Sequence, residues 1–338
     1  MAGFAKRFLV YDGDHKERQN VIWNTVGSGV YALASMVLAF IVMRMAGEDE
    51  GGIFGFGFST YGQQMFIIAY FGIRPFQITD GKQEYTFGDY LRLRTATCGI
   101  AAAAAALHLS FLWFSGEYSF HKSAVIFFLA CYKIIDGFAD VYESEFQRQG
   151  SLYLTGKSNT FRTILSVAVF LITLQFSGNL LTASFGAVLA QMAGVALFNL
   201  TVIRAGVLPD VRFEADTKAC LRLLKNTALL FVSVFLDFYV FSAAKYAIDR
   251  ELTDAMSGYF NILFMPTSVI YLVANFVIRP FLTRLTECWD KQDFDGFGKI
   301  RRQIAMVIGG LTVLAVAGTL LLGRPVLGIM ERILGAGY

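Results

Sequence analysis

The sequence has little charge for its length. Only 16% of its 338 residues are Asp, Glu, Lys or Arg, whereas 55% are hydrophobic. An ordinary soluble domain has about 25% charged residues. A soluble protein of this size would expose a surface that so few charges could not keep hydrated. These proportions exclude a soluble enzyme and predict an integral membrane protein.

Cysteine, histidine and proline are also scarce, with four, three and five residues respectively. The cysteines Cys98, Cys131, Cys220 and Cys288 show no CxxC and no Cys/His spacing, and the histidines are scattered. We therefore expect no disulfide, no metal site and no bound cofactor.

Long apolar runs are plentiful. Each must be a helix, because a backbone in hydrocarbon has to satisfy its own hydrogen bonds, and none shows the two-residue alternation of a membrane barrel strand. The prediction is an all-α, polytopic membrane protein. Its nine expected spans are 21–46, 52–73, 95–115, 123–142, 161–178, 181–203, 226–246, 257–278 and 302–323.

Basic residues indicate the orientation. With the N-terminus in the cytoplasm, 22 of the 29 basic residues, Arg94 and Arg162 among them, fall in the cytoplasmic tail and connections. Six fall on the opposite side, and Lys133 lies inside a span. This ratio follows the positive-inside rule. We expect a membrane protein with a cytoplasmic N-terminus, and outer loops too short for a catalytic domain, hence no enzyme.

An internal repeat is suggested by two hexapeptides, Phe-Gly-Ile-Arg-Pro-Phe at 71–76 and Phe-Val-Ile-Arg-Pro-Phe at 276–281. Weaker sequence matches around the two hexapeptides occur in the same order in both copies. Both copies would have the same orientation, which predicts a six-helix lobe at 1–205 and a lobe at 206–338 with only three helices. We therefore expect the chain to be C-terminally truncated. The alternative is that Arg-Pro simply marks helices that exit to the cytoplasm.

Several motifs together resemble those of one family. A polar head containing Asn20 and Asn24 opens the first span, Phe-Gly-Ile-Arg-Pro-Phe-Gln-Ile-Thr-Asp follows at 71–80, and Glu-Phe-Gln-Arg-Gln-Gly stands at 145–150, before Gly156. The chain resembles the bacterial polysaccharide-biosynthesis flippases, the Wzx-type exporters of lipid-linked oligosaccharides. They share a superfamily with the multidrug and toxin extruders (MATE).

The resemblance implies a fold and a task. The fold is a MATE-like bundle of two helical lobes around a central cavity, here with an incomplete second lobe. The implied location is the bacterial cytoplasmic (inner) membrane, and the task is to move undecaprenyl-diphosphate-linked glycan from its inner to its outer leaflet by alternating access. Membrane lipids and the enzymes that polymerise or ligate the glycan are the implied partners, and no nucleic acid is expected.

A diphosphate in a medium of low dielectric constant needs fixed cations nearby. Arg44 and Lys245 occupy near-equivalent outer positions of the proposed repeats, with snorkelling to the lipid headgroups as the alternative. Lys133 lies in mid-span. Arg74 and Arg279 each precede a proline, which disfavours helix at the arginine, so we expect both to end their helices at the cytoplasmic boundary. They either meet the diphosphate there or anchor the topology.

Acidic residues inside spans are candidates for ion coupling. Asp136 and Asp140 follow Lys133 at helical spacing, with Glu143 on the same face. They either relay a proton or cation, or form a neutral structural pair with Lys133. Asp237 has no charged neighbour one helical turn away and is the first choice for coupling, with a structural hydrogen bond as the alternative.

Other functions remain open at this point. A MATE-type multidrug or cation antiporter requires a net acidic cavity, whereas the charges inside these spans are mixed. A membrane glycosyltransferase requires a large outer loop, which is missing, and a non-transporting remnant fits the short second half. The segment from Gly150 to Ser158 imitates a Walker A loop but has five residues between its glycines, where that loop has four, and no strand before them.

Overall fold

The computed structural model describes residues 8–11, 13–80, 83–206, 208, 211–264, 288 and 292–334. All regular structure in these ranges is helical, with no β-strand, which confirms the predicted all-α class. The chain divides into two compact units, Met1–Tyr259 and Phe260–Tyr338, each described by itself.

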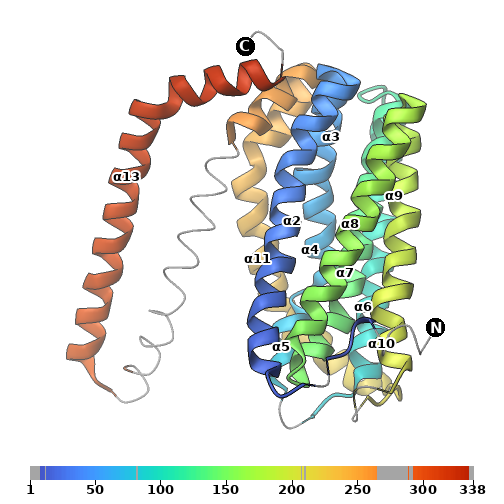
Figure 1. Ribbon diagram of the computed structural model, residues 1–338, viewed down its shortest axis with the longest axis vertical. Helices are drawn as coiled ribbons and strands as arrows, with labels where there is room; N and C mark the ends of the chain where they lie inside the picture. The colour runs from blue at the N-terminus through green and yellow to red at the C-terminus, as the bar shows by residue number, and fades with distance from the viewer. Residues whose placement is uncertain are drawn as a thin grey trace. The chain divides into compact units, whose positions relative to one another are not determined.

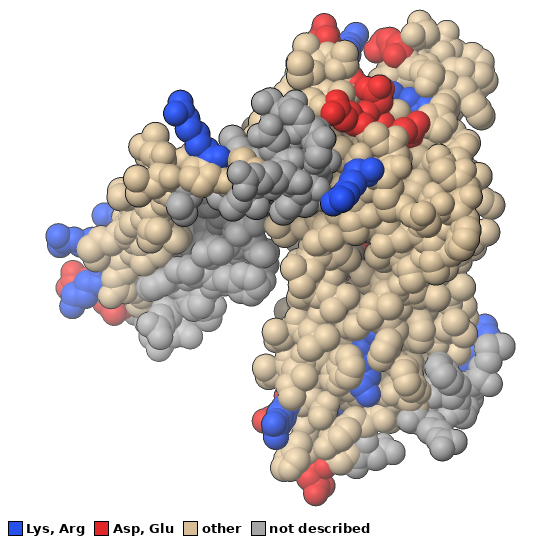
Figure 2. All heavy atoms as spheres, turned by 45° about the horizontal axis from the view of Figure 1, so that its top comes forward, with Lys and Arg blue, Asp and Glu red and all other residues tan. Residues whose placement is uncertain are grey.

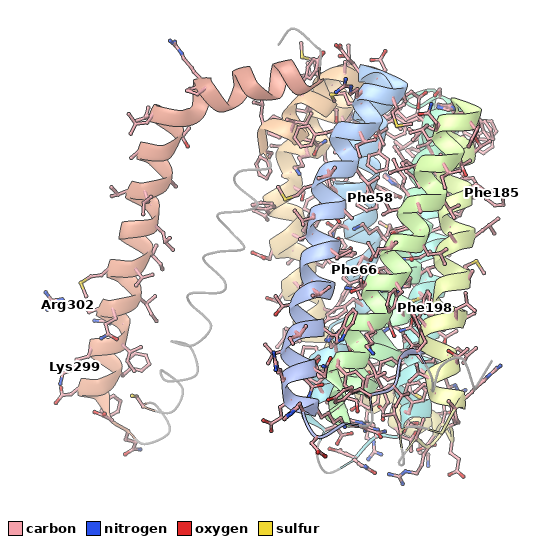
Figure 3. All side chains as sticks on the ribbon, viewed as in Figure 1. Phe58, Phe66, Phe185, Phe198, Lys299 and Arg302 are labelled. Carbon is pink, nitrogen blue, oxygen red and sulfur yellow. The ribbon has the colours of Figure 1, made fainter. Side chains whose placement is uncertain are left out.

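The first unit is a bundle of long helices that run along one direction (Figure 1). Two short π-helical segments, η1 and η2, interrupt it. Its elements are α2 Lys16–Ala46, α3 Glu48–Phe56, η1 Gly57–Tyr61, α4 Gly62–Tyr70, α5 Ile73–Thr79, α6 Phe87–Phe114, α7 Phe120–Arg148, α8 Leu152–Ser177, α9 Leu180–Gly194, η2 Val195–Leu200, α10 Thr201–Arg204 and α11 Thr217–Glu251. The second unit contains α13, Phe294–Leu334, whose first turns carry Lys299 and Arg302 (Figure 3).

Six described helices are long and apolar enough to cross a membrane: 16–46, 87–114, 152–177, 180–204, 217–251 and 294–321. Each contains most or all of a predicted span. Two further predicted spans are also helical, most of 52–73 as the succession α3–η1–α4 and all of 123–142 within α7. Most of the predicted span 257–278 lies outside the described residues. The chain is therefore a multi-pass membrane protein.

The helices extend beyond their apolar runs. Thr86 caps α6, since its hydroxyl accepts a hydrogen bond from the Asp89 amide while the Asp89 carboxylate accepts one from the Thr86 amide. This reciprocal capping box begins α6 at Phe87 rather than at 95. Likewise α8 begins at Leu152 rather than at 161. Arg94 and Arg162, expected in cytoplasmic connections, are therefore buried inside helices, and this expectation was wrong.

The predicted helix end at Arg74 is also wrong. The break falls earlier, at Phe71 and Gly72, whose φ angles of 50° and 66° are left-handed. Arg74 and Pro75 then lie in the first turn of α5. A proline is tolerated there because the first amides of a helix have no intrahelical acceptor. The turn thus directs Arg74 back into the bundle rather than towards the headgroups.

Helix α7 is the centre of the first unit. It contacts α3, α4, α5, α6, α8 and α9, so most of its circumference is covered by protein. Elsewhere the surface is largely apolar along the helices, with acidic side chains gathered at the end where α3 lies (Figure 2). Apolar side chains exposed on α6 and α9, such as Leu107 and Leu189, fit a lipid environment. The polar residues of α7 are therefore held in the interior.

The second Arg-Pro motif at 276–281, including Arg279, lies outside the described residues. The internal repeat and the lobes 1–205 and 206–338 therefore stay predictions.

Candidate functional site

Four ionisable residues form a row along the buried face of α7. Lys133, Asp136, Asp140 and Glu143 follow one another at intervals of three or four residues, and all four side chains are buried. This confirms the shared face expected from their spacing. The partners of the three carboxylates, however, come from helices other than α7.

Asp140 lies between two arginines. Arg94 of α6 donates to its Oδ2 at 3.0 Å, and Arg74 of α5 forms a close ion pair with its Oδ1. The Arg94 guanidinium also donates to the carbonyl oxygens of Ala69 and Tyr70 at 3.2 and 2.7 Å, where α4 ends. The Arg94 side chain is 0% exposed, but that of Arg74 is 24% exposed. One carboxylate thus compensates two cations, of which only Arg74 is accessible.

A second cluster involves Asp136 and Glu143 on the same face of α7. Arg162 of α8 donates to Asp136 at 2.7 Å and pairs with Glu143 at 3.1 Å. Asn199 of η2 donates to the same Glu143 oxygen at 3.4 Å. Two nitrogens of the buried Arg162 guanidinium, Nε and Nη1, have no hydrogen-bond partner within the described part of the chain. In this cluster one arginine thus serves two carboxylates and still retains unused donors.

Lys133 does not pair directly with Asp136. Its Nζ donates to the Tyr31 hydroxyl at 2.8 Å, and that hydroxyl is hydrogen-bonded to Asp136. The ammonium also lies 4.0 Å from the ring centre of Phe58, which is inside the bundle (Figure 3). A cation over an aromatic face is stabilised by the ring quadrupole. Lys133 is thus an enclosed cation, linked to the carboxylates through a hydroxyl.

The motifs at 71–80 and 145–150 meet in space. Gln77 donates to Glu145 at 3.2 Å, Arg74 donates to Gln147 at 2.7 Å, and Arg148 lies 3.8 Å from Asp80. The two segments are about seventy residues apart in sequence and form one polar network at the end of the bundle where α5 lies. The network fixes α5 against α7, and with it the position of Arg74.

The remaining predicted residues are distributed differently. Arg44 is exposed in the last turn of α2, and Lys245 is buried near the same end of α11. Asp237 is exposed on α11 and makes no hydrogen bond or ion pair with any described residue. The roles assigned to these three residues stay predictions.

Sequence reasoning missed Arg94, Arg162 and Tyr31 as members of the site. One signal was available: three carboxylates on the buried face of one helix need more cations than Lys133 supplies. Arg94 lies one residue before the predicted span 95–115, and Arg162 lies at the start of the predicted span 161–178.

The clusters together hold four cations, Lys133 and three arginines, against three carboxylates. Within the described ranges, no group of three or more His, Cys, Asp or Glu side chains is arranged to hold a metal ion. Chemically, the arrangement suits the binding of an anion at Arg74 and the transfer of charge between buried pairs.

Comparisons with known proteins give one informative result. No protein-family profile matches the chain, and no curated protein sequence matches it. Among solved structures, the chain is similar to a multidrug resistance MATE family transporter of the MOP superfamily in its inward-facing conformation. The TM-score is 0.63 at 11% identity, over 94% of this chain and 78% of that chain. The chain therefore has the MATE-like transporter fold.

Proposed function

We propose that the protein is a flippase that moves a lipid-linked, diphosphate-bearing glycan precursor across the membrane by alternating access. The observation that carries the proposal is the sharing of Asp140 by Arg74 and Arg94. Two guanidinium groups on one carboxylate leave one unit of positive charge, and the more exposed of the two is Arg74.

Guanidinium groups bind phosphate with two parallel hydrogen bonds, a geometry that a lysine cannot reproduce. A diphosphate that reaches Arg74 replaces part of its interaction with Asp140, while Arg94 keeps that carboxylate compensated. Neither a buried arginine nor a buried carboxylate is left unpaired during the exchange, which avoids a cost of several kcal/mol. The lipid tail stays in the bilayer, beside the apolar surface of the bundle.

The direction of transport follows from charge. With a cytoplasmic N-terminus, Arg74 lies at the cytoplasmic end. Because the cell interior is electrically negative, moving a negative charge outward is then favourable by about 2.3 kcal/mol per charge per 100 mV. Exchange with an inward proton or cation at Asp237 would add to this driving force. Polymerisation or ligation of the glycan outside would remove the product.

Multidrug or cation antiport is the second candidate, because the structural neighbour is described as a multidrug resistance transporter. A cationic drug needs a site with excess negative charge. The clusters on the buried face of α7, four cations against Asp136, Asp140 and Glu143, carry the opposite excess, which favours an anionic substrate. We therefore place this candidate second and include it in the test.

The test is lipid flipping by the purified full chain in proteoliposomes, with a fluorescent undecaprenyl-diphosphate disaccharide as substrate. We expect Arg74→Ala to reduce the initial rate about tenfold or more, since truncating one partner of a charge pair costs 2 kcal/mol or more. Arg74→Lys should recover only part of the rate. The matched control is Arg92→Ala, which removes an exposed arginine bonded to Thr217, and should leave the rate unchanged.

Two outcomes contradict the proposal. One is no flipping by the wild-type protein together with extrusion of a cationic dye by the same vesicles, which indicates the antiporter. The other is equal flipping by Arg74→Ala and Arg92→Ala, which removes Arg74 from the substrate path.

A further inference from the structure

The far end of α11 carries an ionic cluster that the proposed transport mechanism does not use. Lys122, in the first turn of α7, lies 3.1 Å from Asp249 and 2.6 Å from Asp254. Its Nζ also lies 4.1 Å from the ring centre of Tyr118, and the Tyr118 hydroxyl donates to Asp249. We call these four residues the α11 latch.

The latch is largely withdrawn from water. The side chains of Lys122 and Asp249 are 8% and 1% exposed. Burial raises the pKa of the Tyr118 phenol well above its usual value, so its hydroxyl stays protonated and available as a donor. A buried pair loses much more than an exposed pair when one partner is removed, because the remaining charge has no solvent to replace it.

Backbone packing supports the same contact. A Cβ added to Gly52 of α3 would lie 1.7 Å from the Asp254 carbonyl oxygen, so α3 and the segment after α11 touch backbone to backbone. Only glycine permits this approach. The end of α11 is thus held by α3 and by the start of α7.

The opposite end of α11 is attached by a different kind of contact. Gly88 donates its amide to the Arg212 carbonyl at 2.9 Å, and the Asp216 amide donates to Asp89 at 2.7 Å. These bonds, one between backbone groups and one to the Asp89 carboxylate, fix the connection before α11 to the N-terminus of α6. Between its ends, α11 is mostly exposed. The helix is therefore pinned at one end and held by side-chain charges at the other.

We propose that the α11 latch is a releasable gate: its ion pairs hold the far end of α11 against α3 and α7 in this state, and they break when the passage opens at that end. The inference rests on the proposed transport function. It adds Tyr118, Lys122, Asp249 and Asp254 as residues that set the balance between the closed and open states, with no contact to the substrate.

The test is thiol accessibility of the purified full chain in nanodiscs, where a water-soluble maleimide reaches both faces. The reporter is Ser123→Cys, at a buried position next to Lys122, in a background without the four native cysteines. We expect Lys122→Met to accelerate labelling about tenfold or more, because it leaves two carboxylates uncompensated. The double exchange Lys122→Asp with Asp254→Lys keeps the net charge and should restore slow labelling.

Arg250→Ala is the matched control. Arg250 lies on the same turn of α11, but its ion pair with Glu117 is exposed and 3.6 Å long; such pairs contribute little. The proposal is overturned if Lys122→Met is labelled no faster than the Ser123→Cys reporter protein alone. It is also overturned if Arg250→Ala accelerates labelling equally. If Lys122→Met aggregates, Tyr118→Phe, which removes one hydroxyl, decides by the same criterion. The readout needs no substrate, so a protein that fails to flip lipid leaves this comparison intact.

Discussion

Removing a single buried charge should strongly destabilise this protein, and Arg162 is the clearest case. Arg162 compensates both Asp136 and Glu143. Arg162→Met should therefore destabilise the protein by about 3–5 kcal/mol, since it leaves buried carboxylates uncompensated. The double variant Arg162→Met with Glu143→Gln should be more stable than the single variant. Thermal unfolding in detergent measures both.

The control for that experiment is Arg222→Met, at an exposed position on α11. A loss for Arg222→Met as large as that for Arg162→Met would show a general effect of removing arginine. Failure of Glu143→Gln to recover stability would show that Glu143 does not depend on Arg162.

At this scale the sequence predicted both members of the Arg74–Asp140 pair but missed Arg94, Arg162 and Tyr31, the other partners of the α7 residues. The three- and four-residue spacing along 133–143 is a local property of one helix, so it correctly placed Lys133, Asp136 and Asp140 on one face. Their partners come from α2, α5, α6 and α8, and contacts between helices have no local signal. Counting apolar residues also placed Arg94 just outside the span 95–115, and the tally of basic residues assigned Arg162 to a connection although the span 161–178 includes it. Charged residues end an apolar run even where the helix continues.

Helices approach most closely where neither has a side chain. Gly27 of α2 meets Gly156 of α8, and a Cβ added to Gly156 would lie 2.1 Å from the Trp23 carbonyl oxygen. Gly156→Ala should therefore force the helices apart and destabilise the protein by about 1–3 kcal/mol. Gly99→Ala on α6, where a Cβ meets nothing within 4 Å, should be neutral or stabilising, because alanine favours helix.

Thermal unfolding of both alanine variants measures this difference. An equal effect of the two substitutions would exclude close packing of α2 on α8 as the reason for Gly156. The sequence had drawn attention to Gly156 only as part of a family motif and of a false phosphate-binding loop, and its packing role depends on a helix more than a hundred residues away.

The helices themselves were largely predictable, since twenty apolar residues in a membrane leave the backbone little choice. Their ends were not. The capping box at Thr86 and Asp89 lengthens α6 into the polar segment, and the left-handed turn at Phe71 and Gly72 replaces the expected break at Arg74. Such ends depend on a few hydrogen bonds and dihedral angles, to which hydropathy is insensitive.

For the molecule as a whole, orientation in the membrane gives the proposed sites their meaning. Arg74 lies in α5 at one end of the bundle, and the α11 latch lies at the other end. The excess of basic residues predicts that the Arg74 end is cytoplasmic, the side from which the proposed diphosphate substrate would enter. In intact cells, an impermeant maleimide should therefore label Ser115→Cys, in the connection between α6 and α7, and not Glu84→Cys, between α5 and α6, which should react only after permeabilisation. Both positions are exposed, so each is the other's control. The reverse pattern would place Arg74 outside, make outward movement of an anion start from the wrong leaflet, and exclude the proposed direction of transport.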